Sequence, residues 1–218
     1  MDTTRSLRTT FERQLRRVQR DVLRMGALVE YSCILAREAL CDRNLDSAQQ
    51  LVAHDKQIDQ FYRQIELDCI NLLTLQAPVT QDLRLISAFM QLVRDLERIG
   101  DYAQDIGEVA ITLFPYPPHP CMDRIQTMLD RCRSMVAMSL VSLSNLDAER
   151  GLEIKQKDDA VDADYADLYR LLAHQRDLPG LVEPIVLLVL VIRYLERIAD
   201  HATNIGKRVA YIVTGERT

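Results

Sequence analysis

The chain carries nearly the same twelve residues twice. LERIGDYAQDIG begins at Leu96, and LERIADHATNIG begins at Leu195, 99 positions further on. Two acidic residues recur at matching positions of the two copies: Glu97 with Glu196, and Asp101 with Asp200. A long segment that returns once predicts a chain made of two copies of one structural unit. The fold must therefore offer the same segment two equivalent environments.

The unit between chain breaks is predicted to be a helix. Glycine and proline number only seven each in 218 residues, and aliphatic residues recur at intervals of three and four. Breaks are predicted at CDRNLD (41–46), QAPVTQD (76–82, with Pro78), SNLD (144–147) and QRDLPG (175–180), and Asn44 or Asp46 can cap the second helix. The predicted helices cover residues 4–41, from CDRNLD to 75, 80–114, 123–144, 147–174 and 181–213.

The strongest boundary is PYPPHP at residues 115–120, where four of six residues are proline. Proline lacks a backbone donor and clashes with the preceding turn, so no helix runs through this segment. It separates residues 1–114 from residues 121–218, and each part is predicted as three helices joined by short turns. Short turns make neighbouring helices antiparallel. We therefore expect an all-α fold of two tandem three-helix bundles related by internal duplication.

Charge and composition argue against several classes of protein. The net charge of −5 argues against nucleic acid as a partner, because phosphate backbones are bound by basic surfaces. The five cysteines are scattered without a CxxC pair, which is typical of reduced thiols in a reducing compartment. The most apolar run, residues 185–192, is far shorter than the ~20 residues of a membrane span. We expect a deeply buried helix there, no direct membrane insertion and a cytoplasmic location.

The repeated segment predicts two opposite sides on one helix. Residues four apart lie on the same side of a helix, so Glu97 and Asp101 project together, as do Glu196 and Asp200. The other side is aliphatic in both copies, which predicts that it faces the core. Its residues are Leu92, Leu96, Ile99, Ala103 and Ile106 in the first copy, and Val191, Leu195, Ile198, Ala202 and Ile205 in the second.

A second acidic pair with the same spacing recurs in the preceding helix of each half. DKQID supplies Asp55 and Asp59, and DDAVD supplies Asp158 and Asp162. If the two helices are neighbours, each half presents four carboxylates in one patch. Carboxylates that close repel one another and need protons or cations nearby. Carboxylate oxygens bind hard ions such as Mg²⁺, Mn²⁺ or iron, so the pattern predicts a metal site in each half.

The residues around the carboxylates leave two interpretations open. His201 and Asn204 can add a nitrogen and an oxygen ligand in the second half, where the first half has Tyr102 and Asp105. The alternative is a metal-free surface held by ion pairs to Arg94, Arg98, Arg193 and Arg197. Catalysis has little support, because the chain lacks a Gly-rich phosphate loop, a nucleophile elbow and the Glu-x-x-His spacing of di-iron bundles.

APVTQDLRLISA, LERIGDYAQDI and LERIADHATNIGKRVAYIVTGE together resemble the PhoU family, the phosphate-uptake regulators of bacteria. The resemblance covers nearly the whole chain. It implies a six-helix protein that dimerises and binds multinuclear iron or zinc clusters through the repeated acidic motifs. It also implies a non-enzymatic negative regulator of the phosphate-starvation response. The implied partners are the ATPase of the phosphate ABC transporter and a membrane sensor histidine kinase, which would hold the cytoplasmic protein at the inner membrane.

The resemblance assigns the metal ligands by position. They are Asp55, Asp59, Glu97, Asp101, Asp158, Asp162, Glu196 and Asp200, with His201 and Asn204 in the second half. Iron and zinc are the implied metals, and the oxygen ligands also suit Mg²⁺ and Mn²⁺. Tyr102 and Asp105 depart from the pattern, so the two sites would differ. Two other functions stay open: a carboxylate metal protein with an oxidative or storage role, and a helical scaffold without metal.

Overall fold

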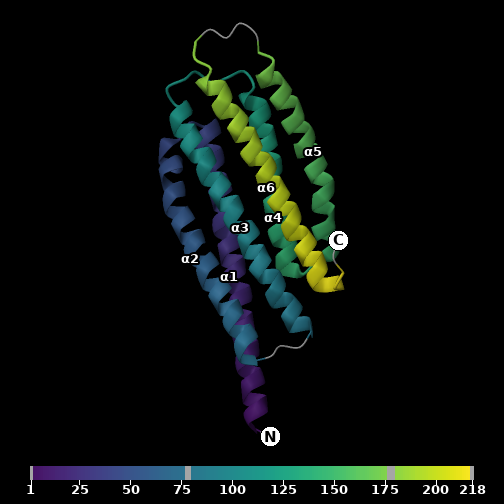
Figure 1. Cartoon of the computed structure of the whole chain (residues 1–218). Helices are drawn as coiled ribbons and strands as arrows, with labels where there is room; N and C mark the ends of the chain where they lie inside the picture. The colour runs from purple at the N-terminus through teal and green to yellow at the C-terminus, as the bar shows by residue number, and fades with distance from the viewer. Residues whose placement is uncertain (1, 77–79, 176–179, 217–218) are drawn as a thin grey trace.

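Six α-helices make up the described part of the chain (Figure 1). The computed structural model describes residues 2–76, 80–175 and 180–216, and no strand occurs in these ranges. The helices are α1 (Asp2–Cys41), α2 (Leu45–Gln76), α3 (Thr80–Leu113), α4 (Met122–Asn145), α5 (Ala148–Ala173) and α6 (Glu183–Thr214). The all-α prediction is confirmed, and the predicted bounds are right to within about two residues. The breaks predicted at Pro78 and within residues 176–179 lie outside the described residues.

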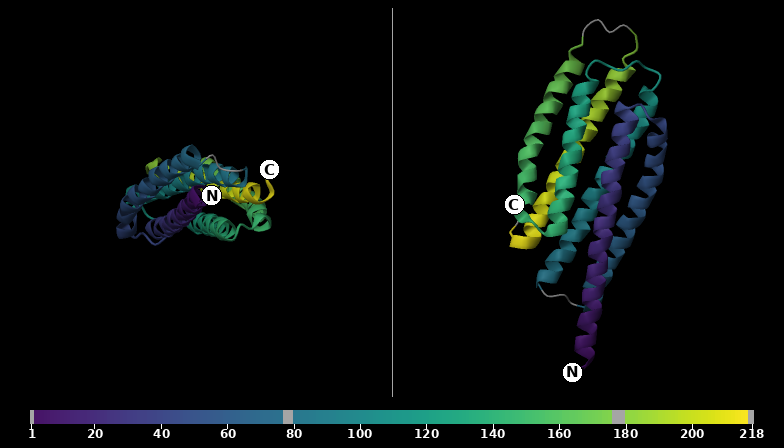
Figure 2. Two further views of the ribbon diagram at one scale, coloured as in Figure 1. Left: turned by 90° about the horizontal axis from the view of Figure 1, so that it is seen from below. Right: turned by 180° about the vertical axis from the view of Figure 1, so that it is seen from behind.

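The two halves are three-helix bundles that lie against each other along their length (Figure 2). Within each half, every helix contacts the other two. Between the halves, α3 contacts α6 and α1 contacts α4, whereas the described residues of α2 and α5 contact only their own half. α3 and α6 run in opposite directions, as Figure 1 shows. The two copies of the repeated segment therefore lie side by side and antiparallel at the centre of the molecule.

The turn after α1 is built by local side chains and tied to the proline-rich segment. Arg43 adopts a left-handed conformation with φ 55°, and Asn44 Oδ1 accepts hydrogen bonds from the backbone N–H groups of Asp46 and Ser47. Asn44 is thus the cap, as one of the two predicted alternatives had it. Arg43 Nη1 donates to the carbonyl oxygen of Tyr116 at 2.9 Å. We call the end of the molecule with this turn, residues 114–121 and the start of α6 the linker end.

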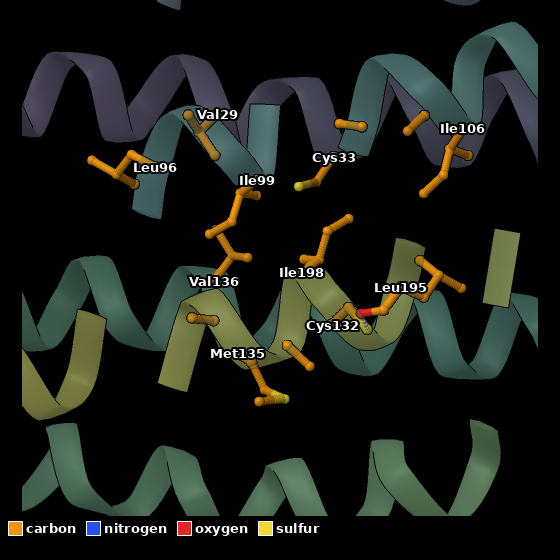
Figure 3. Close-up of a cluster of buried hydrophobic side chains, with 14 of the residues drawn as sticks. Val29, Cys33, Leu96, Ile99, Ile106, Cys132, Met135, Val136, Leu195 and Ile198 are labelled. Carbon is orange, nitrogen blue, oxygen red and sulfur yellow. Dashed lines mark hydrogen bonds between the residues drawn. The ribbon is translucent and has the colours of Figure 1, made fainter. Parts of the chain in front are cut away.

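One hydrophobic core runs through both halves. Figure 3 shows its middle, where residues of four helices meet: Val29 and Cys33 of α1, Leu96, Ile99 and Ile106 of α3, Cys132, Met135 and Val136 of α4, and Leu195 and Ile198 of α6. All ten residues of the predicted aliphatic sides are buried, which confirms that prediction. Because the core is continuous, residues 115–120 separate two repeats of the sequence. The division of the chain into residues 1–114 and 121–218 as two domains stays a prediction.

The apolar run at residues 185–192 corrects one expectation. Its buried members are Ile185, Leu188, Val191 and Ile192. Val186 and Leu190, however, are 53% and 39% exposed, so the prediction of a deeply buried helix was wrong for one side of the run. Eight consecutive apolar residues cover every side of a helix, whereas the neighbouring helices cover only part of α6. No helix in the described ranges has the length and apolarity needed to cross a membrane.

Helices α5 and α6 approach each other closely at two glycines. A Cβ atom on Gly206 would lie 2.2 Å from the carbonyl oxygen of Gly151. The matching residue of the first copy is Gly107, where a Cβ would meet the end of the Leu51 side chain at 2.5 Å. A methyl group can move aside, but helix backbone cannot move without separating the two helices. Position 206 therefore has no room for a side chain, because the backbone of α6 packs directly on the backbone of α5.

Gly206→Ala should destabilise the protein by about 1–3 kcal/mol, because the added methyl overlaps the Gly151 carbonyl group. Gly100→Ala is the matched control: the second copy has Ala199 at this position, and the new Cβ would meet only the Ile58 side chain, from 3.0 Å. Urea unfolding followed by circular dichroism measures both variants. If Gly206→Ala were as stable as the wild type, the close approach of α5 and α6 would be disproved.

Candidate functional site: two carboxylate clusters

Each half holds its four predicted carboxylates where its second and third helices lie side by side. The first cluster consists of Asp55 and Asp59 on α2 with Glu97 and Asp101 on α3. The second cluster consists of Asp158 and Asp162 on α5 with Glu196 and Asp200 on α6. Ile58, beside Asp59, packs on Gly100, beside Asp101. This contact sets α2 and α3 in the register that brings the two acidic pairs of the first half together.

The carboxylates are buried to different degrees, and Asp158 lies on the buried side of α5 with Ile154 and Val161. The exposed fraction of the side chain is 18% for Glu97, 33% for Asp101 and 16% for Glu196. It is 41% for Asp200 and only 5% for Asp158. Burial removes water from a carboxylate and so disfavours its charged form. These carboxylates are therefore less hydrated than those of an ordinary exposed surface.

Basic side chains neutralise part of this charge. Arg98 lies 3.4 Å from Glu97 and 3.1 Å from Asp101. The second cluster has three such pairs: Arg193 with Glu196 at 2.7 Å, Arg197 with Asp200 at 3.3 Å, and Lys155 with Asp158 at 2.9 Å. Arg98, Arg193 and Arg197 are thus counter-ions, as the metal-free interpretation has them. Arg94 forms no ion pair with any described residue.

Burial and mutual repulsion raise the pKa values of the first cluster. Burial raises the pKa of Asp55, and the charges of Asp101, Asp59 and Glu108 raise it further. The pKa values of Glu97 and Asp101 are also raised, chiefly by burial, although Arg98 opposes the shift. These mutual effects show that the carboxylates on α2 and α3 feel one another's charge.

Burial and repulsion also raise carboxyl pKa values in the second cluster, on α5 and α6. Burial and the charge of Asp158 raise the pKa of Asp162, against the opposing charge of Lys155. Burial likewise raises the pKa of Glu196, although Arg193 opposes the shift. Asp158 accepts a hydrogen bond from Lys155 through Oδ2, but its buried Oδ1 has no hydrogen-bond partner among the described residues. A buried acceptor without a hydrogen-bond partner is costly, so this oxygen is available to a ligand.

His201 lies where α3 of the first half packs against α6 of the second, a contact that we call the seam. Its Nδ1 donates to Asp95 Oδ1 of α3 at 2.8 Å, and its ring stacks on Tyr102 with centroids 6.0 Å apart. Asp95 and Tyr194 are matching residues of the two copies, as are Tyr102 and His201. The Asp95–His201 contact is therefore the counterpart of the stack between Tyr194 and Tyr102, whose centroids are 5.8 Å apart. This correspondence shows that an approximate twofold axis relates α3 and α6.

The candidate metal ligands suit a hard cation by chemistry. They supply carboxylate oxygens, and the unpartnered Oδ1 of Asp158 is an available acceptor. In the described residues, however, no three His, Cys, Asp or Glu side chains converge closely enough to hold a metal ion. His201 is bonded to Asp95 across the seam, and its charge acts on Asp101 of the first cluster. Asn204 lies half-buried, one turn beyond Asp200. The metal ligands stay predictions.

Several residues of the site were not predicted. Glu108 extends the first cluster along α3, because its charge raises the pKa values of Asp55 and Asp105. Its position seven residues after Asp101, two turns along the same side, is a signal that helix periodicity offers. Lys155 offers a similar signal, since it lies three residues before Asp158. The pairing of Asp95 with His201 leaves no such signal in the sequence, because it depends on how the two halves pack.

The raised pKa values predict that the metal-free protein is more stable in mild acid. A carboxyl group whose pKa is higher in the folded chain contributes stability that is present below its unfolded pKa and lost as the pH rises through the folded pKa. Asp105 is the clearest case, because burial, Glu108 and Asp55 all raise its pKa. In EDTA-treated protein, Asp105→Asn should therefore raise Tm at pH 7 by a few degrees.

The same variant should show a smaller gain in Tm than the wild type when the pH falls from 7 to about 5. Thermal unfolding followed by circular dichroism measures both effects. Glu153→Gln, at an exposed position on α5 outside the clusters, is the control and should leave Tm unchanged. A lower Tm for Asp105→Asn at pH 7 would show that the charged form is stabilised instead.

Known proteins match the chain along nearly its whole length. The family model described as PhoU domain matches residues 22–110 and 125–209. A "Phosphate-specific transport system accessory protein PhoU homolog" from Synechocystis sp. is 58% identical over 210 residues, which cover 96% of this chain and 94% of the relative.

Two crystal structures share the fold. PhoU from Pseudomonas aeruginosa has a TM-score of 0.91 at 34% identity, covering 94% of this chain and 100% of that chain. The phosphate transport system regulatory protein PhoU from Streptococcus pneumoniae has a TM-score of 0.88 at 29% identity, covering 95% and 99%. Six helices in two matching halves, the repeated acidic motifs and these matches over the full chain together show that the protein belongs to the PhoU family.

Proposed function

We propose that this chain is an accessory protein of phosphate-specific transport that represses the phosphate-starvation response when phosphate is plentiful. One observation carries the proposal: the 58% identity, over nearly the full length of both chains, to a relative named as an accessory protein of the phosphate-specific transport system. The Streptococcus pneumoniae structure is that of a protein named as regulatory for phosphate transport.

The finer proposal is a non-enzymatic adaptor. It joins the ATPase of the phosphate ABC transporter to a membrane sensor histidine kinase, as a cytoplasmic homodimer held at the inner membrane by those partners. An adaptor changes signalling only if it binds one state of its partner more tightly than the other. The two halves share a frame but differ in surface, as Tyr102 and His201 illustrate. Two unlike surfaces on one frame suit two different partners.

Deletion of the gene should derepress phosphate-starvation genes severalfold in phosphate-rich medium, because the signal that phosphate is plentiful no longer reaches the kinase. A transcriptional reporter measured at high and low phosphate reads this out, with the restored gene as the control. A pull-down from native cells in high phosphate should recover the transporter ATPase and the kinase. Normal repression in the deletion strain would remove the regulatory proposal.

We also propose that the clusters bind metal ions. Iron and zinc are the first candidates, and Mg²⁺ and Mn²⁺ suit the same oxygens. The proposed ligands are Asp55, Asp59, Glu97 and Asp101 in the first half, and Asp158, Asp162, Glu196 and Asp200 in the second, with His201 and Asn204 as further candidates. The unpartnered Asp158 Oδ1 and the raised carboxylate pKa values support this, because a cation relieves both. When bound, the ion would neutralise the cluster.

Glu196→Ala/Asp200→Ala should remove metal from the second half and leave the helicity unchanged, since both side chains lie off the core. Elemental analysis of protein purified without chelator gives the metal content per chain, and circular dichroism gives the helicity. Glu153→Ala, at an exposed acidic residue outside the clusters, is the control. Substoichiometric metal in the wild type and in both variants would favour the metal-free scaffold.

A further inference from the structure

An aliphatic strip lies exposed on α6 at the linker end. Val186 and Leu190 lie one turn apart on one side of α6, and Val182, the N-cap residue just before the helix, lies one turn earlier with helical backbone angles. They are 58%, 53% and 39% exposed, and the neighbouring Leu181 is 69% exposed. Aliphatic side chains that gather in this way mark an interaction surface more often than scattered ones do. We call Val182, Val186 and Leu190 the α6 strip.

The α6 strip has an acidic border on α3. Tyr194, one turn beyond Leu190, stacks on Tyr102 of α3. Asp105 and Glu108 follow Tyr102 on α3 at intervals of three residues, so they lie along the same side of α3 as this stack with α6. Their charges add to the effect of burial in raising the pKa of Tyr194. Glu108 accepts a hydrogen bond from the neutral amide of Gln104, and no ion pair between described residues neutralises it or Asp105. Their charge is therefore available to a partner.

Two tyrosines of α5 lie beside Arg193, three residues beyond Leu190 on α6. Tyr165 and Tyr169 stack with ring centroids 6.1 Å apart, and Tyr169 is 46% exposed. The guanidinium group of Arg193 lies 6.0 Å from the Tyr165 ring centroid, and its Nη1 is bonded to Glu196. The basic side chain of Arg193 is thus already paired. The surface as a whole is apolar in the middle and anionic at one edge.

The duplication supplies an internal comparison. The residues of the first copy that match the α6 strip are Leu83, Ser87 and Gln91 on α3. Two of the three aliphatic positions are therefore polar on the matching helix of the other half. The frame does not require aliphatic residues at these positions. Val186 and Leu190 thus need an explanation outside the packing of the chain itself.

We propose that the α6 strip docks an amphipathic helix of a partner protein, with leucine-type residues on one side and lysine or arginine along its flank. An amphipathic helix lays its apolar side on such a strip through residues spaced three and four apart. Charge complementarity selects the basic flank, because Asp105 and Glu108 attract it and repel an acidic helix or an anionic lipid surface. The inference deepens the adaptor role proposed above, and rests on it, by locating one docking surface.

The probe is a fluorescein-labelled 18-residue Leu/Lys amphipathic helix, with a Leu/Glu helix of the same pattern for comparison. Fluorescence anisotropy with the purified full chain measures both affinities. Val186→Ser/Leu190→Gln gives the strip the residues of the first copy and should weaken Leu/Lys binding about tenfold, through the loss of two apolar contacts. Asp105→Asn/Glu108→Gln should weaken it as well and reduce its dependence on salt.

Two controls keep the test specific. Leu67→Gln removes an aliphatic side chain of similar exposure, 53%, on α2 and should leave binding unchanged. Ser87→Val/Gln91→Leu gives α3 the same apolar residues, but the positions that match Asp105 and Glu108 hold Asn204 and Lys207. This variant should therefore gain no affinity for the Leu/Lys helix.

The proposal fails if the Leu/Glu helix binds as well as the Leu/Lys helix, or if Val186→Ser/Leu190→Gln binds like the wild type. It also fails if this variant turns a dimer into a monomer in light scattering, because the strip would then be a contact between two copies. These outcomes are separate from the gene deletion. Derepression in the deletion strain, with no effect of the strip variant on peptide binding, would uphold the regulatory role and reject this surface.

Discussion

The packing of α3 against α6 is the contact on which the rest of the structure depends. Each helix is one copy of the repeated segment, and each buries the same aliphatic side in one shared core. Because α1 and α4 pack on that aliphatic side, the acidic side of α3 faces α2 and the acidic side of α6 faces α5. The carboxylate clusters are therefore a consequence of how the core is shared. A change that shifted α3 along α6 would move both clusters and the seam between Asp95 and His201 together.

The charged carboxylates of each cluster are destabilised by partial burial and by one another's charge. Partial burial and mutual repulsion raise the pKa values of several of them, and arginine or lysine side chains offset only part of the repulsion. A fold selected for stability alone would have neutral residues there, since exposed ion pairs contribute little. Local conflicts of this kind are typical of sites kept for binding. The destabilisation is relieved by a proton, a metal ion or a basic partner, and each of these acts on the same oxygens.

Much of the fold could be predicted from the sequence because helix breaks and periodicity are local properties. The proline-rich segment, a cap at Asn44 or Asp46 and the aliphatic sides of the repeated helices needed no knowledge of the tertiary contacts. What could not be predicted depends on which neighbour covers each side of a helix. Val186 and Leu190 look like core residues by composition, and only the arrangement of α3, α4 and α5 leaves them exposed. His201 looks like a ligand of its own half until the seam pairs it with Asp95 of the other.

The two copies have diverged in a way that separates packing from recognition. The aliphatic positions match because one core accepts both sides, whereas the matching glycines differ: Gly206 packs on the Gly151 backbone and Gly107 on the Leu51 side chain. At the seam, equivalent places hold a hydrogen bond between His201 and Asp95 in one case and a stack of Tyr102 on Tyr194 in the other. The packing of α3 on α6 accommodates a hydrogen bond at one of these places and an aromatic stack at the other. A twofold frame with unlike surfaces offers two different binding surfaces without a second fold. We therefore expect the differences between the copies, more than their shared residues, to determine which partners the protein binds.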